Sequence, residues 1–526
     1  MNLKRLAILL LIFTLSLSGC SFLTGEKAND KENNQGNSGG KLELKWFTVV
    51  DEATSVLPDA QNDFVKKKIE EKFNVDLKME YMPIGPDRDN QLNVKVASGD
   101  VPDMFMTLGV TSQKLALDGV LADMTPFVSP ETVPNYFKWV KEEELKRYAI
   151  EKKFVRAPVP FDRNVYRSYY IRKDWLDKLG LQVPESYDDM MNVMRAFTFK
   201  DPDGNGKKDT YGISVSGNGE KLSIDLPQYI HNDLIGVFMI DKGKLIDVQS
   251  DPRIEKVIDE TVGMMKEGTI DPDWFLNEGT AHIDRAAQGK VGIVAGNTRD
   301  LILDSNPNSL QNKSKAIDPK ADWIPFNPFK DKPGIWSENL PETAFLFPKS
   351  VADQEPEKIK RSVQILDWLA SEEGFLLTHY GIEGKHYTRE GNKITLKPDA
   401  IQKDIVEKGN FLDIYDCFTP NAPEVLGLEV IDPRMTDRDR NIVETIKSYP
   451  KIPSIGTNVT PPKGLNLADF RAKMNEYQAK LLFDEKSGKN WPKYRQELLT
   501  KYKGQAVFQS YVEQIRAVGF KVEDFK

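Results

Sequence analysis

The stretch from residue 201 to residue 212, DPDGNGKKDTYG, places oxygen-bearing groups at alternate positions around a glycine turn. Counted from its first residue, candidate ligands stand at positions one, three, five, seven and nine: Asp201, Asp203, Asn205, Lys207 (through its carbonyl oxygen) and Asp209. Calcium takes six to eight oxygen ligands at about 2.3–2.6 Å, and carboxylates at alternate turn positions converge at that radius. The stretch therefore predicts a calcium site.

Up to position nine the loop has the ligand spacing of an EF-hand, with Gly206 at the sixth position, where the chain must turn sharply. Position twelve, which holds a bidentate glutamate in an EF-hand, is Gly212. The alternative is a turn of Asp, Asn and Gly residues that binds no metal. No second such loop accompanies it, so we expect a structural site rather than a sensor. The loop precedes a predicted strand, Tyr211–Ser216, and so lies at the strand's N-terminal end. Ligands of open α/β sheets gather at the carboxyl ends of strands, so we expect the ion to lie away from any ligand cleft.

The N-terminus has the pattern of an export signal. Lys4 and Arg5 precede an apolar run over residues 6–17, which is too short to span a bilayer of about 30 Å. The run leads into Leu-Ser-Gly-Cys20, which resembles the lipobox of bacterial lipoproteins, where the cysteine carries a diacylglycerol and becomes the mature N-terminus. The alternative is an ordinary signal peptide that has a cysteine near its cleavage site. We predict a signal peptide over residues 1–19 and a lipid anchor at Cys20, on the extracellular face of a bacterial cell membrane.

Residues 20–40 contain the lipidated cysteine and a stretch that is poor in apolar residues and rich in Gly, Asn and charged residues. Such a composition predicts a flexible tether. Residues 41–526 contain no further apolar run of membrane-spanning length, and they are numerous enough for two substantial cores.

Composition excludes several classes of function. The chain carries 72 Lys and Arg against 80 Asp and Glu, a formal net charge of −8 that becomes −10 when the signal peptide removes Lys4 and Arg5. This balance disfavours nucleic acid as a partner. Cys417 is the only cysteine after Cys20, so no internal disulfide can form, and we interpret it as a small buried hydrophobic residue. The four histidines are widely separated and show no zinc spacing.

Short strand-like runs alternate with amphipathic helical patterns, which predicts α/β layers. Strands are predicted at Leu42–Val49, Asp76–Met82, Met104–Leu108, Tyr169–Arg172, Tyr211–Ser216, Val291–Ala295 and Ala344–Phe347.

Six segments, taken in order, resemble the large extracellular solute-binding proteins of ABC importers, in the oligosaccharide-binding group. They are ASGDVPDMF (97–105), GVLADMTPFV (119–128), YYIRKDWLDKLGLQVPESYDDM (169–190), QGKVGIVAG (288–296), YGIEGKHYT (380–388) and NWPKYRQELLTKYKGQAVFQSYVEQI (490–515). Alginate-binding members of this family have a similar calcium loop with an acidic residue after position nine, where this chain has Thr210.

The resemblance implies an α/β, two-lobed, periplasmic-binding-protein-like fold (type II), with crossover strands between the lobes and a ligand cleft between them. Lobe one is expected over about 41–158 plus 291–350. Lobe two is expected over about 159–290 plus later helices that brace both lobes. The implied function is that of a monomeric, membrane-anchored protein, not an enzyme, that captures an oligosaccharide and delivers it to the permease subunits of an ABC transporter.

Candidate ligand-binding residues follow from their placement after strands or in loops between the lobes. Aromatic faces cover the apolar C–H surface of a sugar, and polar neighbours fix its hydroxyl groups. The candidates are Asp51, Glu52, Thr107, Arg163, Trp274, Asn297, Trp336 and Tyr387. For each aromatic residue the alternative is packing in a core or loop. If Arg156, Arg163 or Arg167 faces the cleft, a uronate-containing oligosaccharide becomes a candidate ligand, because arginine pairs with carboxylates through two hydrogen bonds. The alternative is that these arginines form a solvated basic stretch.

Two other functions compete with solute binding. A surface glycosidase or polysaccharide lyase would use a pair of carboxylates, but among 80 acidic residues some pair will always be suitably spaced in the sequence. The chain has no hydrolase signature. An adhesin that grips glycans would need no permease.

Overall fold

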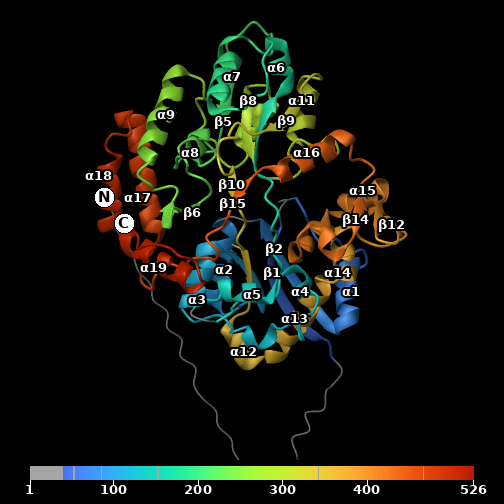
Figure 1. The fold of residues 1–526 in the computed structure, drawn as a ribbon. Coiled ribbons are helices and arrows are strands. Elements are labelled where there is room, and N and C mark those ends of the chain that lie inside the picture. The colour runs from blue at the N-terminus through green and yellow to red at the C-terminus, as the bar shows by residue number, and fades with distance from the viewer. Residues whose placement is uncertain (1–39, 51–53, 84–85, 151–152, 342, 466) are drawn as a thin grey trace, which may run out of the picture. The chain divides into compact units, whose positions relative to one another are not determined.

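The computed structural model describes residues 40–50, 54–83, 86–150, 153–341, 343–465 and 467–526 (Figure 1). The contacts divide the chain into two units, residues 1–41 and 42–526, and the second contains all the helices and strands below. The predicted signal peptide, Cys20 and all but the last residue of the predicted tether lie outside the described residues.

The first sheet has the strand order β11-β3-β1-β2. Its strands are β1 (Leu42–Val50), β2 (Val75–Pro83), β3 (Met104–Leu108) and β11 (Thr343–Leu346). β1 runs parallel to β2 and β3, whereas β11 is antiparallel to β3. Successive side chains of β1 point to opposite faces: Trp46 belongs to one hydrophobic core and Phe47 to another. Both faces are covered at β3 and at the second half of β1, which are nearly continuous apolar runs, whereas β2 alternates polar and apolar residues.

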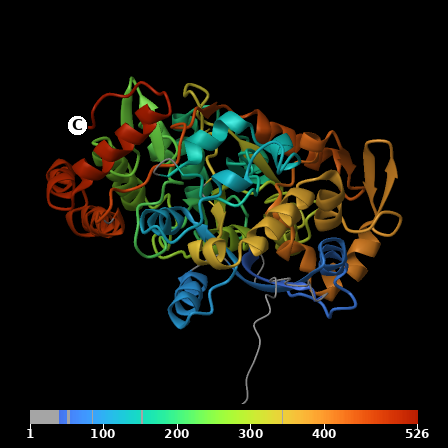
Figure 2. The same cartoon turned by 90° about the horizontal axis from the view of Figure 1, so that it is seen from below.

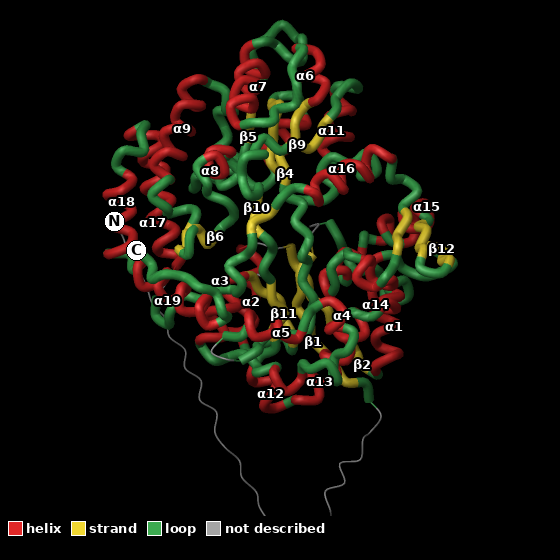
Figure 3. Tube along the Cα trace, in the orientation of Figure 1, coloured by secondary structure: helices red, strands yellow, loops and turns green. Residues whose placement is uncertain are grey.

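The second sheet has the order β5-β8-β4-β9. Its strands are β4 (Ser168–Arg172), β5 (Tyr211–Ser214), β8 (Val291–Gly296) and β9 (Trp323–Phe326). The same alternation recurs, since Ile171 and Tyr170 enter different cores on the two faces of the sheet. Figure 3 shows helices around the strands of each sheet.

The prediction that Val291–Ala295 returns to the first lobe is wrong. β8 pairs in parallel with β5 and antiparallel with β4, so it is a central strand of the second sheet. The strand that returns to the first sheet is β11, which forms hydrogen bonds with β3. Local sequence predicts that Val291–Ala295 is a strand but does not predict its neighbours, which lie about 80 and 120 residues earlier in the chain.

Three small sheets complete the strands. β10 (Trp336–Ser337) pairs in parallel with β15 (Lys451–Ile452), and both lie between the two large sheets in Figure 1. β6 (Phe238–Asp241) and β7 (Lys244–Asp247) form a hairpin. The third sheet contains β12 (Tyr387–Glu390), β13 (Lys393–Leu396) and β14 (Glu429–Ile431).

The helices divide between the two large sheets. Those packed with the first sheet and its extensions are α1 (Phe64–Phe73), α2 (Pro86–Ser98), α3 (Gly109–Leu117), α4 (Tyr136–Trp139), α5 (Glu142–Leu145), α12 (Lys349–Gln354), α13 (Pro356–Leu369), α14 (Glu372–His379) and α15 (Pro398–Asp404). Those packed with the second are α6 (Lys173–Leu179), α7 (Tyr187–Phe199), α8 (Pro227–His231), α9 (Ile254–Glu267), α10 (Ala281–Ala287), α11 (Leu310–Ile317), α16 (Asp437–Ser448), α17 (Leu467–Lys480), α18 (Trp491–Thr500) and α19 (Gly504–Ala517). Figure 2 shows the C-terminal helices (red) on one side and the hairpin of β12 and β13 (orange) on the other.

Local signals set several helix ends. α7 begins after Ser186, whose hydroxyl accepts a hydrogen bond from the N–H of Asp189, as its Pro-Glu-Ser sequence suggests. α16 begins with a capping box between Thr436 and Asp439. α9 ends at Gly268, whose positive φ of 78° suits a glycine.

The packing of β8 against its helices is testable at Gly292. A Cβ atom at Gly292 would lie 2.1 Å from the ring of Phe197 and 3.0 Å from the ring of Trp175. Overpacking of this kind costs about 1–3 kcal/mol. We expect Gly292→Ala to lower the free energy of unfolding by that amount, which urea unfolding would show as a lower midpoint concentration.

Gly263 of α9 supplies the matched control, because a Cβ there has nothing within 4 Å. Alanine at that position should stabilise the protein by about 0.5–1 kcal/mol through helix propensity. An unchanged unfolding midpoint in Gly292→Ala would contradict the packing of β8 against α6 and α7.

Candidate functional site

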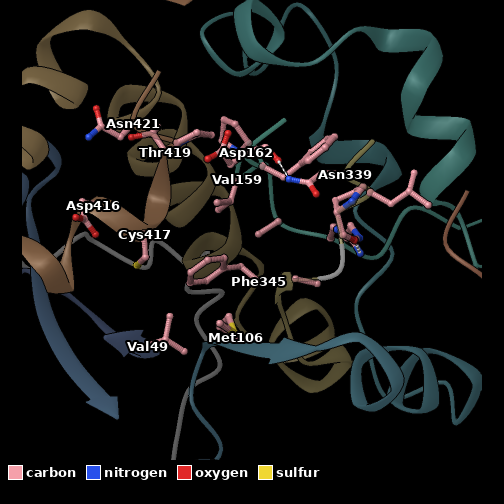
Figure 4. A pocket seen from close by; sticks show the side chains of 18 of the residues that line it. Val49, Met106, Val159, Asp162, Asn339, Phe345, Asp416, Cys417, Thr419 and Asn421 are labelled. Atoms are coloured by element: carbon pink, nitrogen blue, oxygen red, sulfur yellow. Dashed lines mark hydrogen bonds between the residues drawn. The ribbon is translucent and has the colours of Figure 1, made fainter. Parts of the chain in front are cut away.

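A cleft of about 660 Å³ is lined by segments from both large cores (Figure 4). Phe345 belongs to a core of the first sheet and Ile455 to a core of the second. The lining segments are Val49–Val50, Met106, residues 156–157 and 159–162, residues 237–238, residues 336–341, residues 344–345, His379, Asp413, residues 416–417, residues 419–421 and residues 454–455. Most of them come from stretches between elements of the two sheets. A ligand bound here would touch both halves of the unit formed by residues 42–526.

Trp336 is the largest aromatic side chain of the cleft lining. It is partly buried, and the guanidinium carbon of Arg167 lies 3.8 Å from its ring centroid. Arg167 also forms an ion pair with Asp225. The cation therefore holds one face of the indole in a fixed orientation. β15 fixes the backbone of Trp336 by pairing with β10.

The crossing segments are joined by hydrogen bonds at the cleft. Asn339 Nδ2 donates to the carbonyl oxygens of Asp162 and Asn164, at 3.3 and 2.9 Å, and Figure 4 shows Asp162 and Asn339 next to each other. The carboxylate of Asp162 accepts from the N–H of Asn164 at 2.8 Å. Partial desolvation at the cleft raises the pKa of the Asp162 carboxyl, although the side chain is accessible to solvent.

The other side of the cleft comes from the turns η4 (Phe411–Ile414) and η5 (Asp416–Phe418) and the residues after them. Asp413 accepts a 2.6 Å hydrogen bond from the hydroxyl of Ser55, and Asn421 accepts one of 2.8 Å from the hydroxyl of Tyr380. The thiol of Cys417 is only partly buried and lines the cleft, which corrects the expectation of a buried residue.

His379 lines the same side of the cleft and is neutral at physiological pH. Its Nε2 lies 3.1 Å from the carbonyl oxygen of Thr419, and its ring stacks on Phe375 with centroids 4.3 Å apart. Burial lowers the pKa of His379 to about 4.

Of the predicted ligand-binding residues, the structure places Trp336 in the cleft lining. Arg163 lies beside it: its guanidinium forms two hydrogen bonds to Glu144, at 2.9 and 2.7 Å, and lies 4.6 Å from the ring of Phe161, which lines the cleft. Asn297 is exposed in the loop after β8 and does not line the cleft. Asp51 and Glu52 lie outside the described residues. That these residues bind a ligand stays a prediction.

Three candidates are buried away from the cleft, which corrects their proposed access to a ligand. The indole of Trp274 is in the large core of the second sheet, with 1% of the residue exposed. Thr107 is buried in β3 opposite Ala344, and Tyr387 is buried where β12 pairs with β13. Each presents no accessible surface on which a sugar could pack.

Polar cleft residues such as Asp162, Glu338, Asn339, Asp416 and Asn421 were not predicted from the sequence. They form no motif, because they come from separate irregular stretches or their edges, and only Glu338 and Asn339 are neighbours in the sequence. The one available signal is the proline content of these stretches: residues 158 and 160, residue 341 and residue 420 are prolines that interrupt regular structure.

The predicted calcium loop connects α7 to β5 and does not line the cleft. The carboxylate of Asp201 accepts hydrogen bonds from the N–H groups of residues 204, 205 and 206, at 3.0–3.1 Å. Asn205 Nδ2 donates to Asp203 at 2.6 Å and to Asp209 at 3.1 Å. Burial, together with the adjacent Asp201 carboxyl group, raises the pKa of Asp203. The four side chains are therefore gathered at one turn.

These residues fit a calcium ion in part. Their oxygens are of the hard type that calcium takes, and two carboxyl groups within hydrogen-bonding distance of each other are the arrangement that a cation would stabilise. Within the described part of the chain, however, no group of three or more His, Cys, Asp or Glu side chains is arranged to hold a metal. One oxygen of Asp209 is also engaged by Lys290, at 2.6 Å. Further ligands would have to be water or backbone carbonyls.

Two sheets with separate cores and a cleft lined from both define the class of two-lobed binding proteins. Residues 58–374, more than half of the chain, match the bacterial extracellular solute-binding protein family, and the chain belongs to that family. None of the helices in the described ranges is long and apolar enough to cross a membrane.

Curated relatives are similar over most of their length. The chain is 26% identical to the polygalacturonan/rhamnogalacturonan-binding protein YtcQ of Bacillus subtilis, over 76% of this chain and 77% of that protein. It is 24% identical to lipoprotein LipO of the same organism, over 71% of each chain.

Solved structures share the fold at lower identity. An HMO-binding, ABC-transporter-associated solute-binding protein from Bifidobacterium longum infantis superposes with a TM-score of 0.69 at 18% identity, covering 92% of this chain and 100% of its own. Alginate-binding protein AlgQ2, solved without calcium ion, gives 0.66 at 17% identity, covering 91% and 98%. An EF-hand mutant of the substrate-binding protein FusA of Streptococcus pneumoniae gives 0.63 at 16% identity, covering 90% and 99%.

Proposed function

We propose that the protein captures an oligosaccharide in the cleft and delivers it, without cleaving it, to the permease subunits of an ABC importer. The observation that carries the proposal is Trp336, an aromatic ring that lines the cleft and is held by Arg167 on one face. A fixed aromatic ring among amide and carboxylate groups is the combination that covers a sugar's C–H face and bonds its hydroxyl groups. The saccharides in the names of YtcQ and FusA support this ligand class.

Transport requires that the permease distinguish the loaded protein from the empty one. We propose that the two large sheets are the cores of two lobes and that a ligand touching both favours a closed arrangement. A ligand shifts the open and closed populations by its extra affinity for the closed state. The two lobes provide this signal within a single chain, so we propose that the protein acts as a monomer.

Removing the indole should weaken binding. We expect Trp336→Ala to bind an oligosaccharide found by thermal-shift screening about tenfold more weakly, a loss of about 1.4 kcal/mol. Trp336→Phe should recover part of the affinity, because it keeps an aromatic face. Isothermal titration calorimetry measures both.

Phe199→Ala is the control, since Phe199 is an exposed aromatic residue outside the cleft. Unchanged affinity in Trp336→Ala would remove the indole from the site. If excess protein instead shortens the labelled sugar during incubation, the protein is an enzyme and the transport proposal fails.

We further propose that the loop of Asp201, Asp203, Asn205, Lys207 and Asp209 binds a structural calcium ion. The ion would supply positive charge between the gathered carboxylates. The loop joins α7 to β5 outside the cleft, so binding would stabilise the second sheet's core by mass action without touching the sugar.

A chelator should therefore lower the melting temperature and leave sugar affinity unchanged. At a calcium concentration about 100 times the Kd the stabilisation is about 2.7 kcal/mol. Differential scanning calorimetry with calcium and with EDTA measures the difference. Asp203→Asn should melt at the same temperature in both buffers, whereas Lys208→Ala, which removes no predicted ligand, should keep the full difference. Identical melts of the unmodified protein with and without EDTA rule the ion out.

For the location, we propose a lipid anchor at Cys20, which is consistent with the similarity to lipoprotein LipO. In a bacterial host, Cys20→Ser should remove the processed protein from the membrane fraction. The protein should then be found in the medium or remain as an unprocessed precursor. Cys417→Ser, which removes the chain's other cysteine, should leave it at the membrane. Immunoblots of cell fractions measure both variants, and membrane-bound, correctly processed Cys20→Ser protein contradicts the anchor.

A further inference from the structure

The charged side chains of the cleft are unevenly balanced. Four carboxylates line it, and arginine and lysine contribute a single side chain to the described lining: Asp162, Glu338, Asp413 and Asp416 against Arg156. His379 adds no charge, because burial lowers its pKa to about 4. The carboxylates come from both sides of the cleft, so a bound ligand would lie between them.

Two of these carboxylates have their hydrogen bonds with uncharged donors. Glu338 accepts from the N–H of Ser454 at 3.3 Å, and Asp162 accepts from the N–H of Asn164 at 2.8 Å. Neither carboxylate forms an ion pair with any of the residues that the structure describes. Both side chains are exposed at the cleft and keep acceptor capacity for a ligand.

Arg156, which lines the cleft, and Arg163 and Arg167, which do not, all have partners within the protein. Arg156 Nη2 donates to the carbonyl oxygen of Pro341 at 2.5 Å, and its guanidinium carbon lies 5.9 Å from the ring centroid of Tyr148. Arg163 is paired with Glu144, and Arg167 with Asp225. Two of the three positive charges are thus balanced by carboxylates of the protein itself, and the third contacts the wall formed by Pro341.

We propose that the cleft selects an oligosaccharide without carboxylate groups and rejects uronate oligosaccharides, in contrast to the polygalacturonan in the name of the relative YtcQ. The proposal rests on the proposed sugar-binding function and names its ligand class. A ligand carboxylate placed between the carboxylates of both walls meets like charges in a partly desolvated space, which costs affinity and excludes the wrong partner. Sugar hydroxyl groups, in contrast, donate to carboxylates in charge-assisted hydrogen bonds. The uronate ligand considered from the sequence depended on Arg156, Arg163 or Arg167 facing the cleft. Arg156 lines the cleft and donates to the carbonyl of Pro341. Arg163 and Arg167 are paired with Glu144 and Asp225.

Matched pairs of neutral and uronate sugars test this charge rule, namely that the cleft rejects ligands with carboxylate groups. Purified protein would be titrated calorimetrically with neutral and uronate oligosaccharides of equal length, such as galactotriose with trigalacturonate and mannotriose with trimannuronate, after a screen of further neutral and uronate chains. We expect every sugar that binds to be neutral or amino-substituted, and the uronate member of a binding pair to be at least about tenfold weaker at low salt. The difference should shrink at high salt, because screening weakens charge repulsion.

The outcomes separate the two proposals. A uronate that binds more tightly than its neutral counterpart overturns the charge rule and leaves sugar binding intact. Absence of binding by every sugar overturns the proposed function and this inference with it.

Charge-removing variants test the cause. Glu338→Gln and Asp162→Asn keep the shape of the side chain and should narrow the gap between neutral and uronate sugars several-fold. Glu390→Gln, at the exposed end of β12, removes the same charge outside the cleft and should leave the gap unchanged. If the two cleft variants weaken both members of a pair equally, the carboxylates act structurally and the charge rule is overturned.

Discussion

The structure depends on one constraint: a single chain must build two large hydrophobic cores, one for each large sheet. The large core of each sheet draws on segments from distant parts of the sequence, with Trp46 and Phe375 in one and Ile171 and Phe508 in the other. The chain therefore crosses between the sheets several times, and the crossing stretches belong to neither sheet. Their backbone groups need partners of another kind, and Asn339 supplies some by donating to the carbonyls of Asp162 and Asn164. The cleft is the space that these crossings leave.

The same constraint explains why the cleft is polar and why its charges are uneven. A crossing stretch cannot be apolar throughout, since it contributes little to either core. The nearby arginines stabilise the crossings instead: Arg167 stacks on Trp336 and pairs with Asp225, and Arg156 bonds Pro341. These arginines therefore contact the protein's own groups, whereas the carboxylates of Asp162 and Glu338 face the cleft. The way in which the chain crosses between the sheets thus determines which charges a ligand meets.

Local sequence predicted seven of the eight strands that the structure describes in the two large sheets, all but β9, but none of those in the small sheets, and it predicted strand neighbours poorly. The short apolar run of Val291–Ala295 identifies it as a strand, but its place in the second sheet depends on Gly292 fitting against Phe197 and Trp175. Trp274 and Trp336 show why the site could be predicted only in part. Both stand in short sequence stretches rich in Pro, Asp or Gly, and no local pattern separates them. Trp274 packs edge-on against Phe275 inside a core, whereas Trp336 stacks under Arg167, which lies 169 positions earlier in the chain. Contacts of that separation are not encoded in local periodicity.

The loop at residues 201–212 departs from an EF-hand for a reason that lies in the fold. Position twelve is Gly212, at the second residue of β5, and a Cβ there would lie 2.5 Å from Cβ of Met194 in α7. A glutamate cannot occupy that position while the strand packs against the helix. Thr210 is unavailable as well, because its buried hydroxyl donates to the carbonyl of Phe197. Because α7 packs closely on β5, the loop keeps the candidate ligands at positions one to nine but has no side-chain ligand at position twelve. An EF-hand sensor moves its helices when it binds calcium. Here position twelve is fixed inside the core, so an ion held by the loop would stabilise the connection between α7 and β5 without moving it.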